Sequence, residues 1–127
     1  MTLVDTSVLV NVEKGQPLAL ATVQELLEVG ELAVSTVTAH ELLRSPRLPA
    51  AWRAFWTDFL ASVELLDLDL AAAEAAAVVW ASRPNQNEKP DVADVLIAGT
   101  ALAAGCDAIT DDEGFAALAG ARLVRPS

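Results

Sequence analysis

Short apolar runs alternate along the chain with longer segments whose apolar residues recur every three or four positions. The short runs predict buried strands at residues 3–5, 31–36, 63–68, 107–110 and 122–126. The longer segments predict helices at residues 7–13, 17–30, 36–45, 50–62, 69–82 and 91–104, with one small helix before the last strand. In the second helix, for example, Leu20, Val23, Leu26 and Leu27 share one face.

Glycine and proline residues mark the ends of several of these segments. Gly15 closes the first helix, Pro17 opens the second and Gly105 ends the sixth, while the polar segment 83–91 is the main loop. Strands that alternate with helices imply right-handed crossovers and a parallel sheet covered on both faces. The expected fold is therefore α/β with three layers, α/β/α, around a mostly parallel sheet of four or five strands. A length of 127 residues suits a single domain over residues 1–127.

The chain is more apolar than a small monomeric protein requires. Hydrophobic residues make up 54% of it and the mean hydropathy is +0.40, which predicts some apolar surface that meets a partner. The longest nearly apolar runs, 70–81 and 95–106, fall short of the roughly 20 residues that span a bilayer. No basic segment precedes the early apolar run, so we expect no signal peptide and a cytoplasmic protein.

The charge of the chain restricts its partners. A net charge of −10 and a pI near 4.3 argue against a nucleic-acid ligand held by a basic patch. The same balance is compatible with divalent cations or with a basic protein partner. The single cysteine, Cys106, excludes an internal disulfide, and with a single histidine, His40, it cannot build a zinc site of Cys and His ligands.

Acids that follow predicted strands or lie in predicted helices each have an ordinary explanation. Asp5 follows the first strand and can cap the next helix by bonding backbone N–H groups near Ser7 or Val8. Thr38 and Glu41 fit the S/T-x-x-E pattern of a capping box. Taken singly, these acids therefore indicate helix capping.

The later acids have the same kind of explanation. In PDVAD, Asp91 stands at the expected N-cap and Asp94 at the third helical position, where the helix dipole favours negative charge. Asp111 and Asp112 follow the fourth predicted strand and can cap the next short helix.

Taken together, these acids predict more than caps. They should all face the carboxyl edge of one parallel sheet, which is where ligands bind in such folds. Carboxylates a few ångströms apart repel and raise at least one pKa, so caps worth about 1 kcal/mol each do not account for the crowding. A hard divalent cation does, because Mg²⁺ takes oxygen ligands and leaves surplus acids to position or deprotonate a water that attacks phosphorus in line.

Four segments in chain order resemble the signature of a known family. They read VDTSVLV at 4–10, TAHELLRS at 38–45, DVLIAGTAL at 94–102 and ITDDEGF at 109–115. Over nearly the whole chain this series resembles the PIN-domain ribonucleases, in particular the VapC-type toxins of bacterial toxin–antitoxin pairs. The resemblance implies a PIN-like form of the predicted α/β/α fold.

The resemblance also implies an acidic quartet of Asp5, Glu41, Asp94 and Asp112. Asp94 is preferred to Asp91 because it lies just before the LIA-x-T-A stretch. The family pattern T-x-D-x-x-F starts at Thr110 and selects Asp112, with Asp111 as the alternative.

The same resemblance implies a Mg²⁺- or Mn²⁺-dependent endoribonuclease. Asp5 and Asp94 would hold the metal, while Glu41 and Asp112 would complete the cluster and orient or activate the attacking water. The threonines and acids adjacent to the quartet would support these ligands by hydrogen bonds: Thr6, Asp91, Thr110 and Asp111.

The family further implies a homodimer, an RNA substrate and a cognate antitoxin that inserts into the active-site groove. RNA binding would depend on a few basic residues such as Arg44 and Arg47, although Arg44 could instead pair with Glu41 on the helix surface. Trp52 and Trp56, one helical turn apart, are better explained as core or interface residues than as a base-stacking pair. The alternative function is a PIN-like domain that binds RNA or a protein without cutting.

Overall fold

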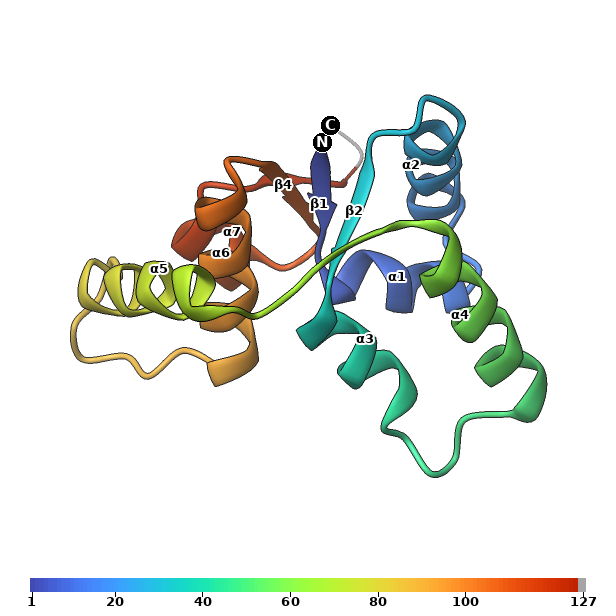
Figure 1. Ribbon diagram of the computed structural model, residues 1–127, viewed down its shortest axis with the longest axis horizontal. Coiled ribbons are helices and arrows are strands. Elements are labelled where there is room, and N and C mark those ends of the chain that lie inside the picture. Colours follow the sequence, from blue (N-terminus) through green and yellow to red (C-terminus); the bar gives the residue numbers. More distant parts are fainter. Residues whose placement is uncertain (126–127) are drawn as a thin grey trace.

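The computed structural model describes residues 1–125, which form five strands and seven helices (Figure 1). The strands are β1 (Thr2–Val4), β2 (Leu32–Ser35), β3 (Glu64–Leu66), β4 (Asp107–Thr110) and β5 (Arg122–Leu123). The helices are α1 (Thr6–Glu13), α2 (Pro17–Glu28), α3 (Thr36–Leu43), α4 (Ala50–Ser62), α5 (Leu70–Ala81), α6 (Val92–Ala104) and α7 (Glu113–Ala119).

Each predicted strand and helix is found at its place in the chain, and the differences concern element ends. The first strand stops at Val4, so Asp5 lies between β1 and α1 rather than within the strand. The last strand was predicted over 122–126, but β5 ends at Leu123, and Pro126 lies outside the described residues. Gly105 ends α6 as predicted, with the left-handed φ of +65° that glycine adopts without strain.

All five strands are parallel and run in the order β3-β2-β1-β4-β5. The chain passes from β1 to β2 and β3 on one side, and later returns to β4 and β5 on the other. Strand order therefore reverses beside β1, where Val4 is in register with Ile109 of β4. In open parallel sheets, such a reversal leaves a crevice at the carboxyl ends of the two strands.

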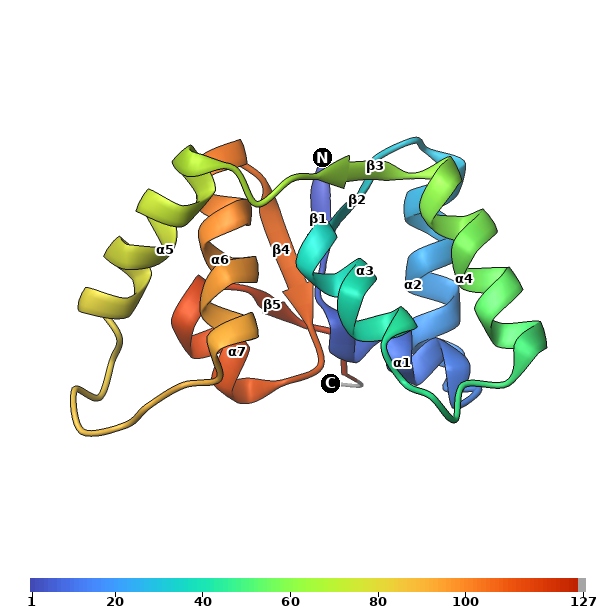
Figure 2. The ribbon, with the colours of Figure 1, turned by 60° about the horizontal axis from the view of Figure 1, so that its bottom comes forward.

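Helices cover both faces of the sheet, α1 to α4 on one side and α5 to α7 on the other (Figures 1 and 2). Alternate strand residues supply two separate cores, as the two-residue period of a strand requires. Leu3 and Ala108 pack with α5, α6 and α7, whereas Val4 and Ile109 pack with α1 to α4. The three-layer arrangement predicted from the sequence is confirmed.

The two tryptophans of α4 belong to the core. Trp56 is fully buried, and its indole N–H donates to Glu13 Oε1 at 2.7 Å. Trp52 is half-buried and stacks on Trp56 with ring centroids 5.7 Å apart. The prediction of a packing role is therefore correct, and burial makes Trp56 inaccessible to a nucleic-acid base.

No helix within residues 1–125 is long and apolar enough to cross a membrane.

Helices α5 and α6 approach each other closely at Gly99. A Cβ at Gly99 would lie 2.5 Å from the Cα of Ala76, a distance at which the backbones must move apart. We therefore expect Gly99→Ala to lower the free energy of unfolding by about 1–3 kcal/mol through overpacking, measured by urea denaturation. This loss should appear even though alanine favours helix by about 1 kcal/mol over glycine.

A matched control is Gly114→Ala in α7, where the added Cβ would meet its nearest neighbour, Asp112 Oδ1, at an ordinary 3.5 Å. That variant should retain wild-type stability. If both variants unfold at the same urea concentration, the close approach of α5 and α6 is not present in solution.

Candidate active site

Asp5 sits at the crevice where strand order reverses. It follows the carboxyl end of β1, and its backbone N–H donates to the carbonyl of Ile109 in β4 at 3.0 Å. Its side chain is only 2% exposed. Carboxylate Oδ2 accepts hydrogen bonds from Thr110 Oγ1 at 2.7 Å and from Ser7 Oγ at 3.0 Å, whereas no group in residues 1–125 bonds to the buried Oδ1.

The expectation that the Asp5 carboxylate caps α1 is wrong. The side chain makes no cap hydrogen bond, and the N–H of Val8 is bonded by the backbone carbonyl of Asp5 at 3.1 Å. The carboxylate instead turns toward Thr110 across the sheet. Burial raises the pKa of Asp5 and the charge of Asp112 raises it further, against the hydrogen bonds from Thr110 and Ser7, which lower it.

Glu41 is held at the same edge of the sheet by α1. The predicted capping box is wrong, because α3 begins at Thr36 and its N-cap is Ser35, whose hydroxyl accepts from the N–H of Val37 at 3.0 Å. Glu41 Oε1 instead lies 2.7 Å from Thr6 Oγ1. A carboxylate can only accept, so the Thr6 hydroxyl proton points to Glu41.

The acids that begin α6 lie as the sequence predicted. Asp91 is the N-cap, its Oδ1 accepting from the N–H of Ala93 at 2.8 Å, and Asp94 lies in the first turn. Asp94 is half-buried, and its pKa is raised to about 7. Loss of solvation on burial is the largest cause, followed by the charges of four other acids: Asp5, Asp91, Asp112 and Glu41.

That set of charges shows which acids converge. Side chains from the end of β1, from α3, from the start of α6 and from the start of α7 all lie close enough to Asp94 to oppose its ionisation. The other three acids of the predicted quartet therefore lie near Asp94, although the four come from four different elements.

Asp111 and Asp112 have different surroundings. Asp111 accepts from Asn11 Nδ2 and forms a 3.1 Å ion pair with the Nε of Arg125. Arg125 Nη2 also donates to the backbone carbonyl of Asp111 at 2.8 Å. Asp112 caps α7 by accepting from the N–H of Gly114 at 3.0 Å, and its charge opposes ionisation of Asp5. Asp111 is thus bonded to the C-terminal segment of the chain, while the charge of Asp112 acts on the acidic cluster.

Ser7 and Asn11 take part in the network but were not singled out from the sequence. Ser7 Oγ also accepts from the N–H of Asp111 at 3.0 Å and so joins the start of α1 to the turn after β4. Both residues lie on α1 four positions apart, a spacing that puts them on one helix face. The positions of these two polar residues, shortly after Asp5 and on one helix face, could have identified them from the sequence.

The two arginines proposed for RNA binding lie beyond α3. Both Arg44, at the C-cap, and Arg47, in the following loop, are exposed. The alternative ion pair between Arg44 and Glu41 is absent from the part of the chain that the structure describes. Glu41 instead bonds to Thr6, which leaves Arg44 available to solvent.

The sequence matches the PIN domain over residues 2–121. The chain belongs to the PIN-domain family. A comparison with curated protein sequences found no match.

Several solved structures share this PIN fold. DNA-bound VapBC from Salmonella typhimurium is 20% identical, with a TM-score of 0.78, and the match covers 96% of this chain and 95% of that one. FitAcB from Neisseria gonorrhoeae is 23% identical, with a TM-score of 0.78 and coverage of 99% and 98%. VapBC-5 from Mycobacterium tuberculosis, a member of the VapBC family of toxin–antitoxin systems, is 23% identical, with a TM-score of 0.65 and 98% coverage of both chains. At these identities the likeness is one of fold.

The hydroxyl of Thr110 should contribute to stability chiefly by solvating the buried Asp5 carboxylate. We expect Thr110→Val to lower the free energy of unfolding by about 1–3 kcal/mol near pH 8, because it removes a donor from a buried charge. The matched control is Thr100→Val, since Thr100 is equally buried but donates to the carbonyl of Leu96 in its own helix. Equal losses in the two variants, measured by urea denaturation, would contradict this role.

The raised pKa of Asp94 predicts how stability depends on pH. Between about pH 4 and pH 7 the folded PIN domain binds more protons at Asp94 than the unfolded chain does, so the free energy of unfolding falls as pH rises. Asp94→Asn should weaken this fall and should melt at a higher temperature than wild type at pH 8. Thermal melts from pH 4 to pH 8 measure the effect.

Asp58→Asn, an equivalent change on the exposed surface of α4, serves as the control and should keep the wild-type pH dependence. Superimposable melting profiles for Asp94→Asn and wild type at every pH would show that the cluster does not strain Asp94.

Proposed function

We propose that this PIN domain is a metal-dependent endoribonuclease that acts as the toxin of a toxin–antitoxin pair. The observation that carries the proposal is the gathering of Asp5, Glu41 and Asp112 around the half-buried Asp94. Burial first, and then the charges of these acids, raise the pKa of Asp94 to about 7. A fold that only needed helix caps would gain little from this crowding, because each cap contributes about 1 kcal/mol.

The side chains present fit a divalent cation. The buried Oδ1 of Asp5 has no hydrogen-bond partner within the described residues, and it belongs to a carboxylate whose desolvation a cation would offset. Within residues 1–125, no group of three or more Asp, Glu, His or Cys side chains is placed so that it could hold a metal ion. Mg²⁺ commonly takes only one or two protein carboxylates and keeps waters, so Asp5 and Asp94 are sufficient protein ligands for Mg²⁺ or Mn²⁺.

A bound ion would supply Lewis acidity at the phosphate and make a coordinated water more acidic. The remaining acids have complementary roles. Glu41, fixed by Thr6, and Asp112, fixed by the N–H of Gly114, can orient the attacking water and accept its proton. The water oxygen bonds to phosphorus in line as the phosphodiester P–O bond breaks, and the departing oxygen takes up a proton.

The proposed partners are an RNA substrate, a second copy of the chain and an antitoxin. Structural neighbours described as VapBC, one of them as a toxin–antitoxin system, support the antitoxin. Exposed apolar residues on α5 and α6, with Leu70 at 74% and Leu102 at 57% exposure, support a homodimer contact. Arg44 and Arg47 are exposed and are proposed to contact RNA phosphates.

Cleavage of total RNA by the purified protein tests the activity. We expect new 5′ ends in Mg²⁺ that are absent in EDTA, and a loss of about 10²-fold or more in rate for Asp94→Asn. Asp58→Asn is the control and should cleave at the wild-type rate. Metal binding measured by calorimetry should be lost in Asp5→Asn.

RNA cleavage that persists in excess EDTA would overturn the metal-dependent mechanism. Stoichiometric RNA binding without any cleavage in Mg²⁺ or Mn²⁺ would favour a non-catalytic PIN-like binding domain instead.

A further inference from the structure

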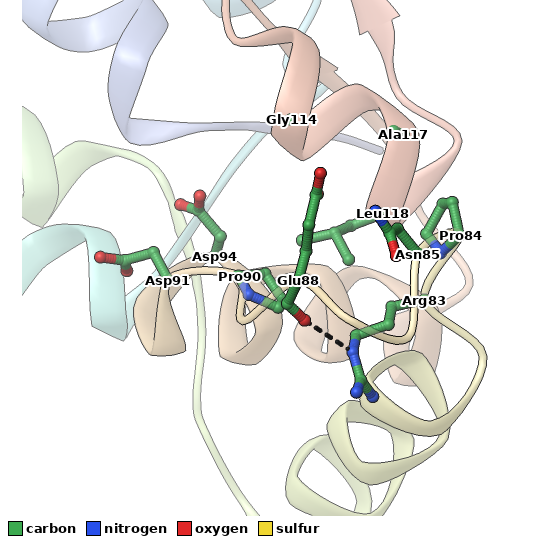
Figure 3. A pocket seen from close by; sticks show the side chains of 10 residues that line it. All are labelled: Arg83, Pro84, Asn85, Glu88, Pro90, Asp91, Asp94, Gly114, Ala117 and Leu118. Carbon is green, nitrogen blue, oxygen red and sulfur yellow. Dashed lines mark hydrogen bonds between the residues drawn. The ribbon is translucent and has the colours of Figure 1, made fainter.

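We propose that a pocket beside Asp94 binds the base of a nucleotide adjacent to the cleaved bond and selects guanine. This inference rests on the proposed ribonuclease function and deepens it by assigning a specificity site. The pocket has a volume of about 250 Å³ and lies between the loop 82–91, the start of α6 and one face of α7 (Figure 3). Asp91 and Asp94 belong both to its wall and to the acidic cluster, so a ligand in the pocket adjoins the site of chemistry.

The pocket wall formed by the loop is held in one shape by Arg83. The Arg83 guanidinium donates to the carbonyls of Trp80, Gln86 and Glu88 at 2.7–2.9 Å and stacks on the Trp80 ring at 4.0 Å. Because these contacts are all internal to the loop and its entry, they fix it without any ligand. A preformed wall lowers the entropic cost of binding.

The chemistry of the pocket excludes a phosphate and admits a base. Its acidic side chains are Glu88, Asp91 and Asp94, and Arg83 is already committed to the loop. Apolar surface from Pro84, Pro90 and Leu118 suits the flat face of an uncharged ring. The volume is somewhat below the roughly 300–1,000 Å³ of pockets for drug-sized molecules, which suits a single ring system.

Glu88 supplies the specificity. Figure 3 shows its side chain reaching from the loop toward Gly114, with Asp94 on one side and Leu118 on the other. Within residues 1–125 its carboxylate has neither a hydrogen bond nor an ion pair, so both oxygens are free to accept. Guanine is the base whose Watson–Crick edge offers two adjacent N–H donors, from N1 and N2, and a carboxylate accepts both in parallel.

Nucleoside binding in EDTA tests the pocket independently of cleavage. Guanosine and uridine carry no phosphate, and saturation-transfer NMR reports their affinities for the wild-type chain, Glu88→Gln and Glu25→Gln. We expect guanosine to bind the wild type more tightly than uridine does, and Glu88→Gln to weaken guanosine about tenfold to a hundredfold. Glu25→Gln makes the same charge change on the exposed surface of α2, outside the pocket, and should bind guanosine as the wild type does.

Both substitutions alter exposed side chains, and Glu88→Gln keeps the backbone carbonyl that bonds to Arg83, so folding should be unaffected. Equal affinity for guanosine and uridine, equal guanosine affinity in wild type and Glu88→Gln, or no guanosine binding at all would each overturn the assignment.

Mapping of cut sites separates this inference from the proposed function. Wild type should cut beside guanine at one fixed position, and Glu88→Gln should lose that preference while still cutting RNA in Mg²⁺. Cleavage without any guanine preference would remove the pocket assignment and leave the ribonuclease intact. The chain could instead bind guanosine through Glu88 but cut no RNA. That result would overturn the ribonuclease proposal and also the placement of the base beside a cleaved bond.

Discussion

The arrangement of this PIN domain depends on one electrostatic conflict, the mutual repulsion of carboxylates gathered at the carboxyl edge of a parallel sheet. Asp5 is nearly fully buried there with one oxygen unbonded by residues 1–125, and Asp94 ionises against four other acids. An unsatisfied buried charged group costs more than about 1–3 kcal/mol. The fold concentrates this unfavourable free energy at one edge of the sheet, which is the pattern expected where a bound ligand offsets it.

Hydroxyl groups rather than cations hold the cluster together within the chain. Thr110 and Ser7 donate to Asp5, and Thr6 donates to Glu41. Arg125 forms ion pairs with Asp111 and Glu113 at this edge and leaves Asp112 to the cluster. Neutral donors orient carboxylates without cancelling their charge, so the cluster keeps its negative potential.

The hydrophobic pattern carried most of the fold, because strands buried on both faces and amphipathic helices differ in period and length. The prediction of helix caps from local sequence was wrong at Asp5 and Glu41. Their side chains bond to Thr110 on a neighbouring strand and to Thr6 on another helix. A capping rule sees only neighbouring positions, whereas Thr110 is 105 residues from Asp5. Motif order, compared with a family, placed both acids in the predicted quartet. The pocket at Glu88 had no sequence signal because three separate elements form it.

The acidity of the chain, which argued against nucleic acid at first, is physically consistent with the proposed ribonuclease function. Phosphate oxygens are acceptors and need a cation, which the cluster around Asp94 is suited to hold. Bases also present N–H donors, and these need acceptors, which Glu88 provides without any positive charge. Under the proposed function, an acidic surface would repel RNA in general but favour a guanine that arrives together with a divalent ion, so selectivity would arise where non-specific attraction is weakest.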